Sequence, residues 1–275
     1  MGLLDPIGCM MWSLTPYDKC DYRCVYCCTR VQGTSKPSVA PGDMLRLVCE
    51  GLDRIPEDEL VIIGAFCDGY PLVEAELGLT RPLVAELIER DRRFAIVTKG
   101  TTVLRDLDLL RRARPGKLQV TISLSTTDEG ALAKLEPAAP SGKERLAVVR
   151  SLSDAGLFVD VNALPWIPDV SDTQAIIDAV PPGVPIVFAP LATGVDRDHL
   201  TLLGRRYLRH EIWERYLAEY ERFGHVPNTS WVQPRLPPTE NDPMYRLPRR
   251  EPPIPAPHPQ GWRAQIGRWL GGVPA

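Results

Sequence analysis

Between Met10 and about Ala192, short apolar runs rich in β-branched residues alternate with longer amphipathic stretches. This alternation predicts parallel βα units, in which each strand is followed by a helix that crosses back over the sheet. Such crossovers are almost always right-handed, so successive units curl in one direction. The units predict an α/β fold of the partial (β/α)6 barrel type, with strands at Met10–Leu14, Leu60–Phe66, Phe94–Thr98, Leu118–Ser123, Phe158–Leu164 and Ile186–Pro190.

The stretches between these strands carry the periodicity of helices that cover one face of a sheet. Each is long enough to cross back from the end of one strand to the start of the next. The expected helices are Pro41–Arg54, Thr80–Arg92, Val103–Arg112, Lys143–Ala155 and Asp172–Val180.

The composition changes beyond Ala192, where the βα pattern stops. Leu200–Phe223 has the spacing of one long helix, whereas prolines crowd the sequence from Pro227 onward. Proline removes a backbone donor and fixes φ, which predicts an extended strap or a disordered tail and no helix or central strand. We therefore expect a barrel core at residues 1–192, a helical element at 193–226 and a Pro-rich C-terminal extension at 227–275.

Three cysteines, Cys20, Cys24 and Cys27, stand at the spacing C-x3-C-x2-C, and Tyr26 precedes the last of them. Soft thiolates select iron–sulfur clusters or zinc, and a [4Fe–4S] cube normally takes four of them. Three thiolates on one loop fill three irons and leave the fourth open. Zinc sites usually bring two separated Cys or His pairs, and no second pair follows here. We expect cluster ligation, with zinc or inert structural thiols as the alternatives.

This loop resembles the fingerprint of the radical S-adenosylmethionine (SAM) superfamily, whose enzymes use the open iron to chelate SAM. Over most of Thr15 to Pro190 the chain is similar to the branch that contains spore photoproduct lyase and the DNA repair photolyase-like proteins. The resemblance implies a TIM-like partial barrel of the radical SAM type, with a [4Fe–4S] cluster and SAM as cofactors. It rests on Thr15-Pro-Tyr-Asp-Lys-Cys, Gly64-Ala-Phe-Cys-Asp-Gly-Tyr-Pro-Leu-Val-Glu, Val97-Thr-Lys-Gly, Thr121-Ile-Ser-Leu-Ser and Leu135-Glu-Pro, which follow in the family's order.

The resemblance also implies individual cofactor contacts. Tyr26 matches the residue that lies against the adenine, while Lys99 and Ser123 match positions that contact SAM. An ammonium and a hydroxyl suit the carboxylate and the ribose of that cofactor. Asp68 and Arg145 complete the expected cofactor-binding set. The alternative is that these are structural residues at the carboxyl ends of the strands, where the active sites of βα barrels lie.

Cys67 stands where relatives in this branch carry Thr or Ser before the Asp. Its thiol is expected at the open mouth of the barrel, close to where SAM and substrate meet. Spore photoproduct lyase carries a functional cysteine in this region, at a different offset, that returns a hydrogen atom to a substrate radical. We therefore expect Cys67 to be the catalytic hydrogen-atom donor, with a buried structural cysteine as the alternative.

The reaction that the superfamily implies is reductive cleavage of SAM to methionine and a 5′-deoxyadenosyl radical, which abstracts a hydrogen atom from substrate. If Cys67 then delivers hydrogen to the opposite face, a carbon centre is epimerised. If the substrate radical fragments first, the enzyme is a lyase. Tyr70, Asn162 and Trp166, at strand ends, are the candidate substrate-pocket residues.

The net charge of −3 comes without the basic stripe that a DNA duplex binder needs. We therefore expect a small-molecule substrate, such as a nucleoside, nucleotide or sugar of a biosynthetic pathway, and no nucleic-acid partner. Three alternatives remain open. They are a spore photoproduct lyase-like DNA repair enzyme, a sulfur-inserting enzyme with an auxiliary cluster, and a non-enzymatic iron–sulfur or zinc module.

The cysteine content and the N-terminal sequence bear on the compartment. Seven cysteines clustered toward the first quarter suit a reducing compartment, and the N-terminus has neither a secretory pattern nor a myristoylation pattern. We therefore expect a cytoplasmic protein without a membrane partner. An electron donor such as flavodoxin or ferredoxin completes the expected partners.

Overall fold

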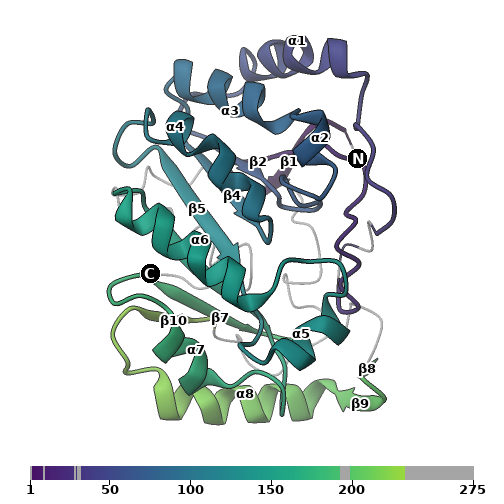
Figure 1. Ribbon diagram of the computed structural model, residues 1–275, viewed down its shortest axis with the longest axis vertical. Coiled ribbons are helices and arrows are strands. Elements are labelled where there is room, and N and C mark those ends of the chain that lie inside the picture. The colour runs from purple at the N-terminus through teal and green to yellow at the C-terminus, as the bar shows by residue number, and fades with distance from the viewer. Residues whose placement is uncertain (1, 9, 28, 30–31, 193–198, 233–275) are drawn as a thin grey trace.

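The computed structural model describes residues 2–8, 10–27, 29, 32–192 and 199–232, and Figure 1 shows their arrangement. Eight strands form one sheet in the order β1-β2-β3-β4-β5-β6-β7-β10. All neighbouring strands are parallel except β1 (Leu4–Gly8) and β2 (Met11–Leu14), which form an antiparallel pair. The remaining strands are β3 (Leu60–Ile63), β4 (Phe94–Thr98), β5 (Leu118–Ser123), β6 (Val159–Trp166), β7 (Ile186–Pro190) and β10 (Thr229–Trp231).

Helices line the outer side of the sheet, from α1 at the top of Figure 1 to α8 at the bottom. Helix α6 shows how the sequence begins such an element, because Ser141 and Glu144 form a reciprocal capping box at its first turn. The predicted partial barrel is confirmed as a mixed α/β fold with a largely parallel sheet. The helices are α1 (Pro41–Leu52), α2 (Glu74–Leu77), α3 (Thr80–Glu89), α4 (Leu107–Leu110, after the 3-10 turn Thr101–Asp106), α5 (Glu129–Leu135), α6 (Gly142–Asp154), α7 (Thr173–Ala179) and α8 (Arg209–Phe223).

The two faces of the sheet differ in chemistry because side chains alternate along each strand. Val120 and Ile122 of β5 face the helices and belong to the main hydrophobic core. The opposite, inner face is apolar on β1 to β4 and polar on β5 and β6. The apolar part is Ile7, Met11, Leu60, Ile62 and Ala95, and the polar part is Gln119, Thr121, Ser123, Asp160 and Asn162.

The segment predicted as a single helix over Leu200–Phe223 differs in its first part. Residues His199–Leu202 (β8) and Arg205–Leu208 (β9) form an antiparallel hairpin, and only Arg209–Phe223 is helical. Leu203 and Gly204 make the two-residue turn, and both have positive φ angles of 51° and 77°. Such a turn matches the twist of a hairpin, and the glycine was the sequence signal for it.

The C-terminal extension begins with a strand. Thr229–Trp231 pairs in parallel with β7 at the edge of the sheet, where Trp231 stacks on Phe188 with ring centroids 4.4 Å apart. The prediction of a strap or tail at 227–275 missed this strand, while residues 233–275 lie outside the described part of the chain. Among the described residues, no helix combines the length and the apolar character that a membrane span requires.

Candidate active site

Five hydrogen bonds join the cysteine loop to segment 70–80 and to the end of helix α5. The Tyr22 hydroxyl donates to the carbonyl of Tyr70 at 2.5 Å, and the Tyr17 hydroxyl donates to the buried carboxylate of Glu74. The carboxylate of Asp21 accepts from the backbone N–H groups of Leu72 and Val73. The Val25 N–H donates to the carbonyl of Leu135 at 2.8 Å. Segment 70–80 and helix α5 therefore hold the loop from two sides.

Glu74 is the best-connected of these anchors. Its carboxylate is fully buried and accepts from Tyr17, from the Thr80 N–H at 3.1 Å and from Arg105. Arg105 also pairs with Asp106, whose other oxygen accepts from the Tyr70 hydroxyl at 3.1 Å. Because breaking a satisfied buried network leaves uncompensated charges, this arrangement fixes where the loop sits.

Cys20 and Cys27 both meet the segment that follows β3. The Cys27 sulfur lies 3.1 Å from the Thr29 hydroxyl, which donates to the carbonyl of Phe66 at 3.0 Å. The Cys20 sulfur accepts hydrogen bonds from the Cys67 thiol and from backbone N–H groups of Tyr22 and Asp68, and the bond from Cys67 is the main reason that its pKa is lowered. Cys24 is buried, which raises the pKa of its thiol to about 11.

Cys67 is only 1% exposed. Its hydrogen bond to Cys20 raises the pKa of its thiol, and burial and the negative charge of Asp68 act in the same direction. Cys67 therefore carries its proton at neutral pH. Cys67 was expected at the open mouth of the barrel, whereas the structure buries its side chain and turns its sulfur toward Cys20, a predicted cluster ligand.

Lys99, Tyr26 and Glu136 meet beneath the cysteine loop. The Lys99 ammonium lies 5.7 Å from the centre of the Tyr26 ring, and the Tyr26 hydroxyl donates to Glu136. Burial opposes the charge on Lys99, but Tyr26, Cys24 and Glu136 around it raise its pKa well above the usual range. Burial also opposes ionisation of Glu136, yet the charges of Lys99 and Arg145 outweigh it and lower its pKa. The pair is therefore an ammonium and a carboxylate at neutral pH.

The guanidinium of Arg145 is buried, and all of its contacts are with other residues of the protein. It is 1% exposed, its Nε donates to the carbonyl of Pro140 at 2.8 Å, and its Nη1 donates to the carbonyl of Ser123 at 3.1 Å. Its Nη2 forms an ion pair with Glu136, although these two atoms lack the alignment of a hydrogen bond. Arg145, expected to touch the cofactor, here positions Glu136 and the end of β5.

Asp68, like Arg145, uses its polar atoms to bind other residues of the protein. Its carboxylate accepts from the Thr98 hydroxyl at 2.5 Å and from the backbone N–H groups of Lys99 and Tyr70 at 2.8 and 2.9 Å. Burial nevertheless raises its pKa. Asp68 thus joins the turn after β3 to the end of β4, directly beneath Lys99.

The three expected substrate-pocket residues separate into two groups. Tyr70 is fully buried with its hydroxyl on Asp106, and the Trp166 indole donates to Thr173 at 3.1 Å inside the core. In contrast, the side chain of Asn162 makes no hydrogen bond within the described part of the chain. Asn162 lies beside Ser123 in the register of β5 and β6, on the inner face of the sheet.

Lys99, Ser123 and Asn162 share one property. Within the described residues, the Lys99 ammonium has no hydrogen bond or ion pair, and neither side chain of Ser123 and Asn162 has a hydrogen-bond partner. Lys99 follows the last residue of β4, Ser123 ends β5, and Asn162, in the middle of β6, pairs with Ser123, so the three lie side by side on neighbouring strands. Because buried polar groups normally find protein partners, this row is the part of the inner face that can bind a ligand.

The donor set at the cysteine loop suits a soft metal centre. Three thiols lie on one loop, and the charges of Cys20 and Cys27 both act on the pKa of Cys24, so they are near neighbours. Among the residues that the structure describes, however, no three His, Cys, Asp or Glu side chains converge as a preformed metal site. Cys20, Cys24 and Cys27 have the chemistry of a three-thiolate site, with Cys20 engaged by Cys67.

Comparison with known proteins decides the family. The Radical SAM superfamily matches residues 14–178, which is more than half of the chain. The chain belongs to the radical SAM superfamily. Members of this superfamily use a [4Fe–4S] cluster and SAM, and these are the cofactors of the family to which the chain belongs.

Two curated relatives of this radical SAM protein are themselves uncharacterised. The protein MJ0683 of Methanocaldococcus jannaschii is 27% identical over 215 residues, which cover 76% of this chain and 78% of the relative. The protein Rv2578c of Mycobacterium tuberculosis is 29% identical over 147 residues, or 53% of this chain and 42% of the relative. Neither provides a substrate.

Two solved structures share the fold. A spore photoproduct lyase mutant with bound AdoMet and dinucleoside spore photoproduct has a TM-score of 0.56 and 17% identity, covering 80% of this chain and 75% of that one. Streptococcus suis SuiB bound to precursor peptide SuiA has a TM-score of 0.57 and 13% identity, covering 84% and 50%. Because one neighbour holds a dinucleoside and the other a peptide, the fold does not exclude a nucleic-acid substrate.

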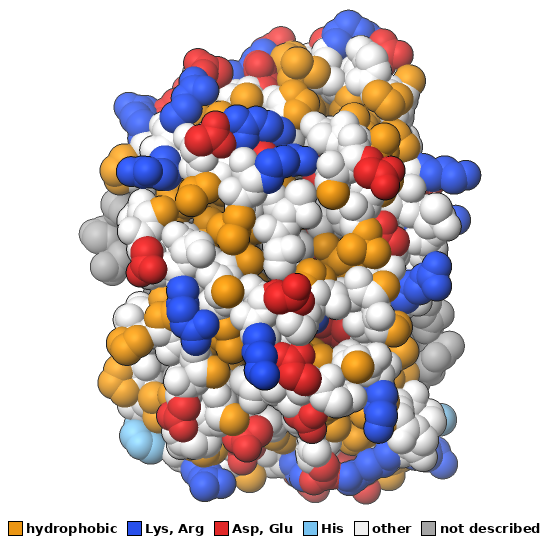
Figure 2. Space-filling model, in the orientation of Figure 1, with side chains coloured by type: hydrophobic (Ala, Val, Ile, Leu, Met, Phe, Trp, Pro, Cys, Tyr) orange, Lys and Arg blue, Asp and Glu red, His pale blue; other side chains and the backbone are white. Residues whose placement is uncertain are grey.

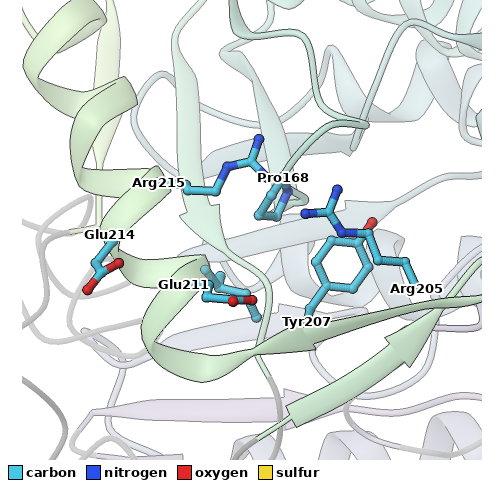
Figure 3. A pocket seen from close by; sticks show the side chains of 7 residues that line it. Pro168, Arg205, Tyr207, Glu211, Glu214 and Arg215 are labelled. Carbon is cyan, nitrogen blue, oxygen red and sulfur yellow. The ribbon is translucent and has the colours of Figure 1, made fainter.

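A surface cavity of about 200 Å³ lies between the hairpin and helix α8 (Figure 3). Arg205 and Arg215 point into it, and both form ion pairs with Asp169 just after β6. Both cations of the cavity therefore already have a carboxylate partner within the protein. The hairpin side chain Tyr207 packs in a small apolar cluster that reaches Tyr26, so this cavity borders the radical SAM site without being part of it.

Sequence reasoning gave no site role to three residues that shape this site. Glu74 and Arg105 stabilise the cysteine loop from below, and Thr29 connects Cys27 to the turn after β3. Glu74 was visible in the motif Tyr70-Pro-Leu-Val-Glu, but the motif does not say that its partner is Tyr17, 57 positions earlier. A long-range partner of this kind has no signal in a single sequence.

Proposed function

We propose that this protein is a radical SAM enzyme that removes a hydrogen atom from a small polar metabolite of the nucleoside, nucleotide or sugar class. One observation carries the proposal. Lys99, Ser123 and Asn162 form a row of polar groups without partners among the described residues, and Lys99 at one end of the row lies beside Tyr26 of the cysteine loop. The ammonium and the hydroxyl suit the carboxylate and the ribose of SAM, and the amide of Asn162 remains for a hydroxyl or base group of the substrate.

In this proposal Cys20, Cys24 and Cys27 hold the [4Fe–4S] cluster. When bound, the cluster supplies one electron to SAM, and the cleaved cofactor supplies the group that abstracts hydrogen. Lys99 receives the SAM carboxylate, because its ammonium is charged and forms no ion pair with any described residue. Glu136 keeps Lys99 charged, and Tyr26 keeps an aromatic face beside it. Burial of this group excludes water from the reacting atoms.

Cys67 is proposed as the donor of the returning hydrogen atom. Cys67 precedes Asp68, whose carboxylate accepts a hydrogen bond from the Lys99 backbone N–H. Cys67 is therefore close to the proposed cofactor site at Lys99. Donation requires the thiol to turn from the Cys20 sulfur toward the inner face of the sheet. The S–H bond then breaks and the substrate carbon gains the hydrogen atom. An external thiol must afterwards give a hydrogen atom to the sulfur radical of Cys67, which regenerates the Cys67 thiol.

The first test is cofactor cleavage. Protein reconstituted without oxygen is reduced with dithionite and incubated with SAM, and 5′-deoxyadenosine is quantified by mass spectrometry. We expect release of 5′-deoxyadenosine that disappears in Cys24→Ala and falls at least tenfold in Lys99→Met. Fully loaded protein that yields none would contradict the proposed function.

The second test concerns Cys67 and the substrate. Candidate nucleosides, nucleotides and sugars are incubated in heavy water with the wild type, Cys67→Ala and Cys49→Ala. Cys49 lies on α1 and serves as the matched control. We expect Cys67→Ala to cleave SAM but to lose deuterium incorporation, while Cys49→Ala keeps both. Activity on a thymine dinucleotide photoproduct alone would favour a lesion-repair enzyme instead.

A further inference from the structure

The outer side of the cysteine loop forms a small apolar and basic surface. Val25, between Cys24 and Tyr26, is 47% exposed, and Leu72 is 52% exposed. Leu72 is held against the same loop, because the Asp21 carboxylate accepts from its backbone N–H at 3.0 Å. An exposed valine inside a cluster-binding motif has no packing role, so it is available for contact with another molecule.

Four exposed cations stand on the same loop and on the helix that the loop contacts: Lys19, Arg23, Lys36 and Lys134. Lys134 belongs to α5, whose neighbouring residue Leu135 accepts from the Val25 N–H. None of the four forms an ion pair within the part of the chain that the structure describes. We name the surface made by Lys19, Arg23, Val25, Lys36, Leu72 and Lys134 the loop face.

The charge of the loop face is opposite in sign to that of the chain. Its two nearby carboxylates, Asp18 and Asp21, are engaged by backbone N–H groups of Lys36, Leu72 and Val73. Against these two carboxylates of the loop itself, the four cations leave a net charge of +2 on the six residues, whereas the whole chain carries −3. Figure 2 shows Lys and Arg side chains along the right-hand edge, where the cysteine loop runs in Figure 1.

We propose that the loop face is the docking surface for an acidic one-electron carrier protein. The inference rests on the proposed function, since only a cluster needs such a donor. A carrier seated on Val25 is one residue from the ligand Cys24, which gives a short path to the cluster. Redox encounters bury small interfaces and depend on charge complementarity for their rate, as a basic rim around two apolar side chains provides. In the transfer the carrier loses one electron and the cluster gains it, and no atom moves.

The test uses the reconstituted protein, chemically reduced flavodoxin as the carrier, and stopped-flow absorbance of the cluster. The variant is Arg23→Glu with Lys134→Glu. We expect the second-order reduction rate at low ionic strength to fall roughly tenfold or more and its salt dependence to flatten, because rim charges act mainly on association. Arg54→Glu with Arg111→Glu, two exposed cations elsewhere on the surface, is the matched control and should stay within about twofold.

Two further measurements keep the outcomes separate. Dithionite needs no docking surface, so it should reduce the Arg23→Glu/Lys134→Glu protein at the wild-type rate. Calorimetric titration with oxidised flavodoxin reports binding even if a variant loads less cluster, and we expect its Kd to rise roughly tenfold. An unchanged rate and an unchanged Kd in this variant would overturn the docking surface. Failure of dithionite-reduced wild type to cleave SAM would overturn the proposed function instead.

Discussion

The buried pair of Arg145 and Glu136 provides a direct test of how this site is built. In Arg145→Met, the fully buried Glu136 carboxylate loses its ion-pair partner, and two carbonyl groups lose a donor. Breaking a buried ion pair by removing one member costs about 3–5 kcal/mol. Lys99 remains as a second cation near Glu136, so we expect about 3 kcal/mol. For a domain of this size each kcal/mol lowers Tm by about 2–4 °C, which gives a fall of roughly 6–12 °C.

Urea unfolding of the cluster-free protein, followed by circular dichroism, measures this loss without any contribution from cofactors. Arg46→Met is the control, because Arg46 is an exposed arginine whose ion pairs with Asp43 and Glu50 lie on the surface. Exposed pairs contribute about 0–1 kcal/mol. The two arginine variants should therefore differ by about 2 kcal/mol or more.

A double-mutant cycle makes the reasoning refutable. Glu136→Gln alone leaves Arg145 buried with its two carbonyl acceptors, and the double variant removes both charges of the pair. Because neither charge is then uncompensated, the double variant should lose at least about 1 kcal/mol less than the sum of the singles. Additive losses, or an Arg145→Met cost equal to that of Arg46→Met, would show that the pair is not coupled.

Three other predictions follow from the same structure. Gly64→Ala should lower the unfolding free energy by about 3 kcal/mol, because Gly64 has a φ of +98° and a Cβ there would overlap the Val97 carbonyl. Gly116→Ala is the control: its φ is +80° but a Cβ meets open space, so it should lose less stability in the same urea assay. Glu74→Gln should load less iron under identical reconstitution, because it removes the charge that holds Arg105 and Tyr17 beneath the cysteine loop; iron content equal to wild type would exclude this anchoring role. Because the pKa of Glu136 is lowered on folding, its carboxylate contributes fully to stability above the ordinary value of 4.5, and this contribution is lost as the pH falls below that value. The difference in unfolding free energy between wild type and Glu136→Gln should therefore become smaller in acid. A difference that stayed constant from pH 7 to pH 3 would contradict this prediction.

The barrel could be predicted from the sequence because its signal is local. β4, β5 and β7 begin and end at the expected residues, since each is a short β-branched run between turns. The hairpin at 199–208 was missed because its residues also fit a helical period, and only Gly204 argues for a turn. The strand Thr229–Trp231 was missed because aromatic packing on Phe188 stabilises it, and that contact joins distant parts of the chain.

The site residues also divide into those whose surroundings the sequence indicated and those whose surroundings it did not. The family motifs pointed to Lys99 and Ser123, and among the described residues neither side chain has a polar partner; Lys99 lies beside Tyr26 of the cysteine loop, and Ser123 ends β5. The expected positions at strand ends also pointed to Tyr70 and Trp166, whose polar groups are satisfied by Asp106 and Thr173. A motif marks the strand end at which a residue stands, but the direction of its side chain depends on packing that the sequence does not encode locally.

The contrast between satisfied and unsatisfied groups is the physical basis for where a ligand binds. Leaving a buried polar group without a partner costs about 1–3 kcal/mol, so a fold keeps such groups only where something else supplies the bond. Arg145 and Asp68 use all of their polar atoms or nearly all of them to fix the ends of β4 and β5. Lys99, just after β4, Ser123 on β5 and Asn162 on β6 remain as a row of polar groups without partners among the described residues. Binding SAM or substrate there should recover that cost, so the Tm of the cluster-free wild type should rise with SAM and that of Lys99→Met should rise less.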